Sequence, residues 1–194
     1  MEDKATLRRS ALSRRRALSD ADRERAAETL LGYVDVLPVP TPAMVSGFWP
    51  IRGEINPIPL MRAYRDRGCG LCLPAIIDKT TIVFREWSDD DRLVETGFGT
   101  MGPDAEARIV DPRVLLVPVA VFDRRGGRIG YGAGYYDRVI EKLRGKGLDP
   151  KLIGVAFSCQ EIESVPVESH DQALDMIVTE TEIINCRPNS VQGS

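Results

Sequence analysis

The sequence holds too few histidines and cysteines for a zinc centre. Among 194 residues there is one histidine, His170, and there are four cysteines. Cys69 and Cys72 have the C-x-x-C spacing, but they lie in an apolar run typical of a strand, where positions i and i+3 face opposite sides. Cys159 and Cys186 lie far from that pair and from each other. A histidine-rich or four-cysteine site is therefore excluded, and we expect reduced cysteines partly in the core.

The chain also lacks a net positive charge and a long apolar run. Its formal net charge is −3, with 43% hydrophobic and 28% charged residues, so no overall positive field favours nucleic acid. No apolar run reaches the roughly 20 residues of a membrane span, and the Arg-rich residues 1–16 have no apolar centre of a secretory signal. Glu2 and Asp3 argue against an organelle transit peptide. We expect a cytoplasmic monomer that binds neither membrane nor nucleic acid.

Short apolar stretches alternate with helical patterns, which predicts an α/β fold: a layered α/β/α arrangement with a largely parallel sheet. Helices are expected over residues 2–18, 19–34, 58–67 and 135–144. The second begins with a weak capping box, Ser19 to Asp22, and carries an apolar stripe of Ala26, Ala27, Leu30, Leu31 and Val34. Strands are expected over 43–49, 70–74, 81–87, 114–121, 152–157 and 176–179, with a turn at 78–80 and loops around 89–91 and 97–103. We take residues 1–187 as one domain and 188–194 as a polar tail.

The most distinctive stretch is glycine-rich and spans residues 123–138. It follows an apolar run and precedes a helical pattern, and it contains Gly126, Gly127, Gly130, Gly132 and Gly134. Glycine lets a ligand approach the backbone closely, while free N–H groups and the dipole at a helix start favour an anion. Arg124, Arg125 and Arg128 add positive charge, and Asp137 is a candidate metal ligand. This pattern predicts a phosphate site.

Two common nucleotide motifs do not fit the glycine-rich stretch. No Gly-Lys-Ser/Thr follows it, so it is not a Walker A loop, and Tyr135 stands where G-x-G-x-x-G requires its last glycine. The alternative is a turn-rich hairpin with arginines for solubility. Tyr135, Tyr136 and Asp137 favour the ligand site, because burying two rings and a carboxylate at a helix start for stability alone would be unusual.

Residues 127–138, Gly-Arg-Ile-Gly-Tyr-Gly-Ala-Gly-Tyr-Tyr-Asp-Arg, resemble the signature of the 5-formyltetrahydrofolate cyclo-ligase family, whose members are also called 5,10-methenyltetrahydrofolate synthetases. Residues 4–8 resemble its N-terminal K-x-x-x-R, and residues 49–57 resemble its substrate loop around a Glu-Ile pair. Its C-terminal pattern is matched in order by residues 154–157, Gln160, Pro166, His170-Asp171, Asp175 and Thr179-Glu180. The resemblance covers about residues 4 to 180, and it implies a synthetase-like, CoA transferase-like α/β fold.

The resemblance implies an activity and a set of site residues. The family uses ATP and Mg²⁺ to convert 5-formyltetrahydrofolate to 5,10-methenyltetrahydrofolate, with release of ADP and phosphate. The implied ATP-binding residues are Lys4, Ala5, Thr6, Leu7, Arg8, Arg128, Ile129, Gly130, Tyr131, Gly132, Ala133, Gly134, Tyr135 and Tyr136. The implied folate-binding residues are Trp49, Glu54, Tyr131, Gly132, Ala133, Gly134 and Tyr135, with Glu54, Arg128 and Tyr135 in catalysis. Asp137 and Asp171 are the implied Mg²⁺ ligands, a carboxylate pair that suits this ion together with phosphate oxygens and water.

The sequence departs from the family pattern at two places. Many members have lysine where this chain has Ala133, so that phosphate contact is either absent or supplied by Arg125 or Arg128. Residues 98–103 match the family's F-G-I-x-E-P only in part, because Thr100 and Gly102 differ.

Several simpler interpretations stand beside the implied roles. Lys4 and Arg8 could be solvated surface charges, Asp137 a helix-start carboxylate, and Asp171 a turn cap. Two other classes of function are a nucleic-acid module, which would need aromatic residues among the N-terminal arginines, and a different ATP-dependent ligase or kinase. Trp49 and Glu54 argue against the second class, because they match the folate side of the family pattern.

Overall fold

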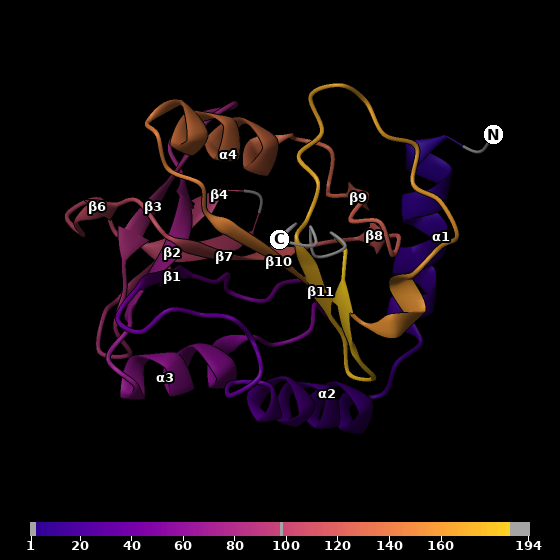
Figure 1. Ribbon diagram of the computed structural model, residues 1–194, viewed down its shortest axis with the longest axis horizontal. Helices are drawn as coiled ribbons and strands as arrows, with labels where there is room; N and C mark the ends of the chain where they lie inside the picture. The colour runs from indigo at the N-terminus through magenta and orange to yellow at the C-terminus, as the bar shows by residue number, and fades with distance from the viewer. Residues whose placement is uncertain (1–2, 98, 187–194) are drawn as a thin grey trace, which may run out of the picture.

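The computed structural model describes residues 3–97 and 99–186. The predicted helix start at Glu2, residue Phe98 and the predicted tail 188–194 lie outside the described residues, so the division into one domain and a tail stays a prediction. The described chain folds around an eight-stranded sheet in the order β12-β11-β10-β7-β1-β2-β3-β6 (Figure 1).

The centre of the sheet is parallel and its edges are antiparallel. The parallel strands are β1 (Met44–Ser46), β2 (Gly70–Ile76), β7 (Val114–Pro118), β10 (Lys151–Val155) and β11 (Met176–Val178). The antiparallel strands are β3 (Ile82–Glu86), β6 (Ile109–Val110) and β12 (Ile183–Asn185). The predicted α/β fold with a mostly parallel sheet is confirmed.

Helices cover both faces of this sheet, because successive strand side chains point to opposite sides. Leu116 of β7 and Ile153 of β10 pack toward α2 (Asp20–Gly32) and α3 (Ile58–Asp66), whereas Leu115 and Leu152 pack toward α4 (Tyr135–Gly145). Figure 1 shows α4 on one side of the sheet and α2 and α3 on the other. The result is the predicted α/β/α layering.

The cysteine pair follows the same alternation. Cys69 belongs to the core cluster under α3, whereas Cys72 belongs to the cluster under α4. All four cysteines are free thiols. The prediction that Cys69 and Cys72 face opposite sides is confirmed, and a shared metal is sterically excluded.

A third apolar cluster joins the N-terminal helix to the glycine-rich stretch. Ala11 of α1 (Lys4–Arg16) packs with Val121 of β8 (Val121–Phe122) and Ile129 of β9 (Arg128–Ile129). In Figure 1, α1 stands beside β8 and β9 at one end of the sheet. The start of the chain therefore lies against a segment more than a hundred residues away in sequence.

The structure corrects several predicted elements. The glycine-rich stretch is partly a hairpin, β8–β9, whose turn is held by the buried Asp123 carboxylate as it accepts the amides of Arg125 and Gly127. The loop predicted at 97–103 falls largely in a second hairpin, β4 (Leu93–Gly97) with β5 (Thr100–Pro103). Gly102 lies in β5. Glycine suits this position because a Cβ there would come within 2.8 Å of the Pro74 carbonyl oxygen.

Helix and strand ends also differ from the prediction. The strand expected over 43–49 is only three residues long: it ends at Ser46, and Phe48 and Trp49 line a cavity. The strand expected over 152–157 gives way after Val155 to a short 3-10 turn, η1 (Ser158–Gln160), and the sequence did not predict β12. The predicted capping box of α2 is present: Ser19 Oγ accepts the Asp22 amide, and Asp22 accepts the Ser19 amide.

The apolar stripe of α2 gives a test of the core. Leu30 is fully buried, whereas its neighbour Leu31, predicted in the same stripe, is 39% exposed. We expect Leu30→Ala to lower the free energy of unfolding by about 2–5 kcal/mol, because it removes buried methyl groups and leaves a cavity. Leu31→Ala is the matched control and should change it by about 0.5 kcal/mol or less. Urea unfolding measures both; equal losses would contradict this packing.

Candidate active site

A cavity of about 470 Å³ opens at the carboxyl ends of the parallel strands. Its walls come from the loop after β1, from the ends of β2 and β7, and from the segment between β9 and α4. This edge of an open α/β sheet is where such folds bind ligands. Segments far apart in the sequence meet here, since Lys4 and Arg8 of α1 and Asp171 of the loop before β11 also line the cavity.

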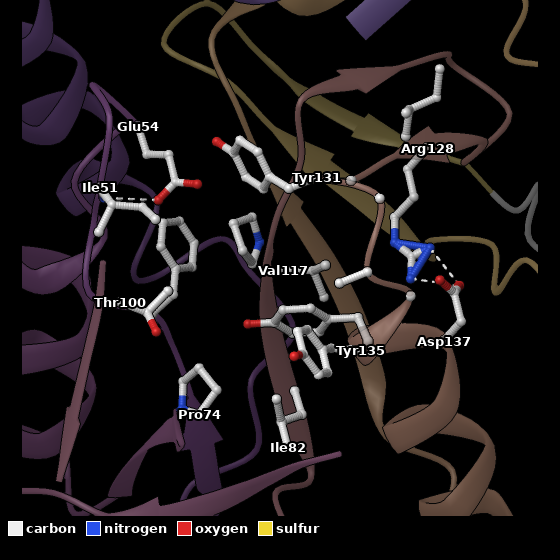
Figure 2. A pocket seen from close by; sticks show the side chains of 18 of the residues that line it. Ile51, Glu54, Pro74, Ile82, Thr100, Val117, Arg128, Tyr131, Tyr135 and Asp137 are labelled. Carbon is white, nitrogen blue, oxygen red and sulfur yellow. Dashed lines mark hydrogen bonds and ion pairs between the residues drawn. The ribbon is translucent and has the colours of Figure 1, made fainter. Parts of the chain in front are cut away.

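The predicted site residues converge here. The cavity is lined by Lys4, Arg8, Trp49, Glu54, Arg128, Ile129, Gly130, Tyr131, Gly132, Ala133, Gly134, Tyr135, Tyr136, Asp137 and Asp171. Three predicted ATP-binding residues do not line it: Ala5, Thr6 and Leu7, of which Leu7 packs in the apolar cluster behind α1. Figure 2 shows Glu54 and Tyr131 toward one side, Arg128 and Asp137 toward the other, and Tyr135 between them.

One end of the cavity pairs cations with carboxylates. The Arg128 guanidinium is almost fully buried and donates from both terminal nitrogens to Asp137 Oδ1, at 3.0 and 2.8 Å. Asp137 Oδ1 also accepts the Gln172 amide at 2.9 Å. Burial lowers the pKa of Arg128, and the charges of Asp137 and Asp171 offset part of that effect, so both carboxylates lie near this guanidinium.

Lys4 forms the second charged group of this end. Its ammonium donates to Asp171 Oδ2 at 2.7 Å and lies 3.1 Å from Glu168 Oε1. Partial burial opposes the charge on Lys4, but the two carboxylates outweigh it and raise the lysine pKa. His170, assigned no role from the sequence, is exposed beside them, with Nε2 3.5 Å from Glu168 Oε2. These contacts tie α1 to the loop before β11.

The backbone between β9 and α4 is open to a ligand. Arg8 Nε donates to the Gly130 carbonyl at 2.7 Å and holds this segment to α1. Gly132 and Gly134 have φ of 101° and 65°, left-handed values that strongly favour glycine. Gly134 is the N-cap of α4 and supplies no side-chain cap, so the first amides of this helix are left for an anion.

The other end of the cavity is acidic and aromatic. Glu54 is 9% exposed, and its Oε2 accepts the Ile51 amide at 3.0 Å. Burial raises the pKa of the Glu54 carboxyl; a hydrogen bond with Tyr131, the Ile51 amide and nearby Arg15 and Arg52 reduce the shift without reversing it. Trp49 packs edge-on against Trp87, with ring centroids 6.3 Å apart. Flat rings beside a buried carboxylate suit a flat heterocycle that carries hydrogen-bond donors.

Comparisons with known proteins agree with this geometry. A model of the 5-formyltetrahydrofolate cyclo-ligase family matches residues 1–180. The 5-formyltetrahydrofolate cyclo-ligase of Mycolicibacterium smegmatis is 31% identical over 185 residues, 91% of this chain and 93% of that protein. The one of Escherichia coli is 29% identical over 180 residues, 88% of this chain and 96% of that protein. The NMR structure of Aquifex aeolicus 5,10-methenyltetrahydrofolate synthetase has a TM-score of 0.82 at 29% identity, covering 98% of this chain and 96% of that chain.

The chain belongs to the 5-formyltetrahydrofolate cyclo-ligase family. The predicted family is thus confirmed, and the chain is an enzyme of the cyclo-ligase class. Within residues 3–97 and 99–186, no helix has the length and apolar character that crossing a membrane would require. The cytoplasmic location stays a prediction.

Arg125 and Arg128, the two possible substitutes for a lysine at position 133, lie in different places. Arg128 lines the cavity. Arg125 does not, and its guanidinium instead donates to Ser164 Oγ at 2.6 Å and to Asp123. Of the two, only Arg128 is placed to meet a ligand in this cavity. Arg138 contacts the Ala133 carbonyl from outside, where its Nη2 donates at 2.6 Å.

Two residues near the site were missed from the sequence. Arg15 and Arg23 hold the turn that precedes Glu54, through its carbonyls at positions 52 and 53. The sequence pattern that could have indicated Arg15 is its helical spacing from Lys4 and Arg8. Lys4, Arg8, Ala11 and Arg15 follow one another at intervals of four, three and four, which places them on one face of a helix.

The predicted Mg²⁺ ligands can be tested against their surroundings. The described residues contain no group of three or more His, Cys, Asp and Glu side chains that could hold a metal ion by themselves. In the described chain, Asp137 makes its hydrogen bonds through Oδ1, and Asp171 makes them through Oδ2. Each carboxylate therefore keeps a second oxygen. This donor set fits a cation that takes its remaining ligands from phosphate and water, as Mg²⁺ commonly does.

The burial of Glu54 predicts a pH-dependent effect on stability. Its pKa is raised above the ordinary value of 4.5, so the folded protein binds the proton more tightly than the unfolded chain. The stability of the wild type should therefore fall, relative to Glu54→Gln, as pH rises from about 4.5 through the folded-state pKa. Above that window the difference should be constant.

Urea unfolding of both proteins at a series of pH values measures this difference. Glu141→Gln, on the exposed face of α4, is the control and should show no such trend. A Glu54→Gln protein that loses stability relative to the wild type with rising pH would contradict the assignment of burial as the main cause.

Proposed function

We propose that this protein converts 5-formyltetrahydrofolate to 5,10-methenyltetrahydrofolate and uses ATP with Mg²⁺, releasing ADP and phosphate. The observation that carries the proposal is a single cavity with two chemically different ends. One end holds Lys4, Arg8, Arg128 and the uncapped start of α4, which suit phosphates. The other holds Trp49, Glu54 and Tyr131, which suit a pterin. The names of the relatives agree with this substrate.

In the proposed reaction, the formyl oxygen attacks the γ-phosphorus of ATP, so that an O–P bond forms and the bond to ADP breaks. N10 of the folate then attacks the formyl carbon and closes a five-membered ring. The phosphorylated oxygen leaves as inorganic phosphate, and N10 loses its proton. Phosphorylation thus turns a poor leaving group into a good one.

Phosphoryl transfer requires mainly positioning and neutralised charge. Lys4, Arg8 and Arg128 would contact the phosphates of ATP, with the amides at the start of α4. Residues 128–136 would form the wall along which the nucleotide lies. Since Arg128 is nearly fully buried, its charge would be poorly screened by water and well placed to stabilise the transferred group.

Asp137 and Asp171 would hold the magnesium ion through their second oxygens. A magnesium ion held there would supply positive charge against the phosphates of ATP. Both carboxylates are fixed by the protein, Asp137 by Arg128 and the Gln172 amide, and Asp171 by Lys4 and the Glu168 amide. They would therefore meet the ion without reorganising their backbone.

At the folate end, Trp49 and Tyr135 would flank the ring system and Glu54 would accept a hydrogen bond from the pterin or N10 region. A carboxyl whose pKa burial has raised is a suitable base, because it takes up a proton more readily than an exposed glutamate. We assign Glu54 the proton that N10 loses during ring closure. The proposed catalytic residues are thus Glu54, Arg128 and Tyr135.

An absorbance assay for the methenyl product tests the proposed activity directly. Purified protein with ATP, Mg²⁺ and 5-formyltetrahydrofolate should form product, and omission of ATP or Mg²⁺ should stop it. Asp137→Asn should reduce kcat by about 10²-fold or more, because it removes one anionic ligand while it keeps an acceptor for Arg128. Glu141→Ala, one turn further along the exposed side of α4, should retain full activity. ATP hydrolysis without methenyl product would favour a kinase or another ligase.

The role of Glu54 as base has its own test. Glu54→Gln should slow single-turnover ring closure by about 10²-fold at saturating folate, the usual contribution of a general base. Stopped-flow absorbance with enzyme in excess measures that rate apart from folate affinity. If the variant bound folate more weakly but closed the ring at the wild-type rate, Glu54 would be a binding residue only.

A further inference from the structure

Arg15 is a buried arginine close to the site that makes no salt bridge in the described part of the chain. Its side chain is 2% exposed and projects from α1. Nη1 donates to the Tyr131 hydroxyl at 2.8 Å, and Nη2 donates to the Arg52 carbonyl at 3.0 Å. The guanidinium also lies over the Tyr131 ring, 5.8 Å from its centroid. One side chain therefore joins the glycine-rich segment to the loop that carries Glu54.

The turn that Arg15 holds has an unusual backbone. Arg52 and Gly53 have φ of 53° and 76°, two successive residues in the left-handed region, which is unfavourable for arginine. Such a conformation persists only where its surroundings hold it. The hydrogen bond from Arg15 reaches the carbonyl of Arg52, and Arg23 Nη1 donates to the next carbonyl, of Gly53, at 2.5 Å. Arg23 also donates to the Arg15 carbonyl at 2.9 Å.

This turn sets the place of Glu54, the residue that follows it. The Glu54 carboxylate accepts the Ile51 amide and is hydrogen-bonded to Tyr131, so the direction of its side chain depends on how residues 51–53 and Tyr131 are held. Tyr131 faces Glu54 across the same end of the cavity (Figure 2). Because Arg15 binds both the turn and Tyr131, it fixes the spacing of the two walls between which the pterin would lie.

A purely structural role explains the contacts of Arg15 less well. Buried arginines are usually neutralised by a carboxylate, since an unpaired buried charge is costly. Arg15 instead donates to neutral oxygens, and its Nε has no hydrogen-bond partner among the described residues. The carboxylate whose charge it influences is that of Glu54. Its position is thus better explained by the site than by the core.

We propose that Arg15 is a positioning residue that fixes Glu54 and Tyr131 relative to each other and thereby sets the affinity for the folate substrate. The inference rests on the proposed function, because it takes that end of the cavity as the folate site. Arg15 does not line the cavity itself, so it acts through its two partners. Lys4 and Arg8, at the proposed ATP end, lie about three and two turns away on the same helix and keep their own contacts.

The test is a comparison of the two substrates in Arg15→Lys. Lysine keeps the positive charge but cannot present the planar fork that reaches two acceptors at once. We expect the KM for 5-formyltetrahydrofolate to rise about tenfold, the scale of one lost charged hydrogen bond, while the KM for ATP changes less than about twofold. Arg14→Lys is the matched control, because Arg14 is exposed and donates to the Cys159 carbonyl away from the cavity. It should leave both values unchanged.

Tyr131→Phe keeps the inference testable if Arg15→Lys loses stability, because Arg15 stays intact and the lost hydroxyl should by itself weaken folate binding. That hydroxyl accepts from Arg15 and is hydrogen-bonded to Glu54. Where both variants fold, a double-mutant cycle gives a second test. If Arg15 acts through Tyr131, the combined variant should bind folate more tightly than the sum of the two single effects predicts. Strict additivity, or an equal rise in both KM values, would overturn the inference.

Equilibrium binding separates this inference from the proposed function. Tryptophan fluorescence reports binding of 5-formyltetrahydrofolate without turnover, since Trp49 lines the cavity. A wild-type protein that binds no folate would overturn both proposals. A wild-type protein that binds folate, with the same affinity in Arg15→Lys, would overturn only the role of Arg15. The wild type could also bind folate without forming product, while Arg15→Lys binds it about tenfold more weakly. That result would support the role of Arg15 and contradict the proposed reaction.

Discussion

Ala11 of α1 is fully buried against Val121 and Ile129, and the charged side of the site follows from that contact. The helix packs on the β8–β9 hairpin through Ala11, with Leu7 and Leu12 against the same apolar cluster. Its charged residues meet the cavity and its walls. Lys4 reaches the loop before β11, Arg8 the segment between β9 and α4, and Arg15 the turn before Glu54. Loss of this packing would therefore disturb the contacts to three separate loops at once.

The cavity balances buried charge in two different ways. At one end each carboxylate has a cation, Asp137 with Arg128 and Asp171 with Lys4, so that the charges are held in place before a ligand enters. At the other end, Glu54 forms no salt bridge within residues 3–97 and 99–186; it accepts the Ile51 amide and hydrogen-bonds Tyr131, and burial raises its pKa. Paired charges favour binding and orientation, whereas an unpaired buried carboxyl favours exchange of a proton. The division matches a reaction that transfers a phosphoryl group at one end and a proton at the other.

The sequence predicted those helices and strands whose structure is determined by neighbouring residues in the chain. Strand β7 is buried on both faces and reads as an unbroken apolar run, and the Ser19 to Asp22 box fixes the start of α2. Strands β5 and β9 were missed because glycines in and beside them look like loop residues, although Gly102, for example, serves a close backbone contact. The site residues came from a resemblance and not from local pattern. The helical spacing of Arg15 places it on the face of Lys4 and Arg8, but no local pattern pairs it with Tyr131, 116 residues further along the sequence.

At the end of the cavity proposed for folate, several residues lower the stability of the fold. Three features each disfavour the folded state: a left-handed Arg52, a buried Glu54 with a raised pKa, and a buried Arg15 that makes no salt bridge with any described residue. They occur together, within one turn and the helix that holds it, whereas the core clusters on both faces of the sheet consist of apolar side chains. Such a concentration is expected where binding geometry, and not stability, decides the residues. The apolar core supplies the stability that these residues reduce. The turn at Arg52 and Gly53 follows β1, which lies in the parallel centre of the sheet and is supported on both sides.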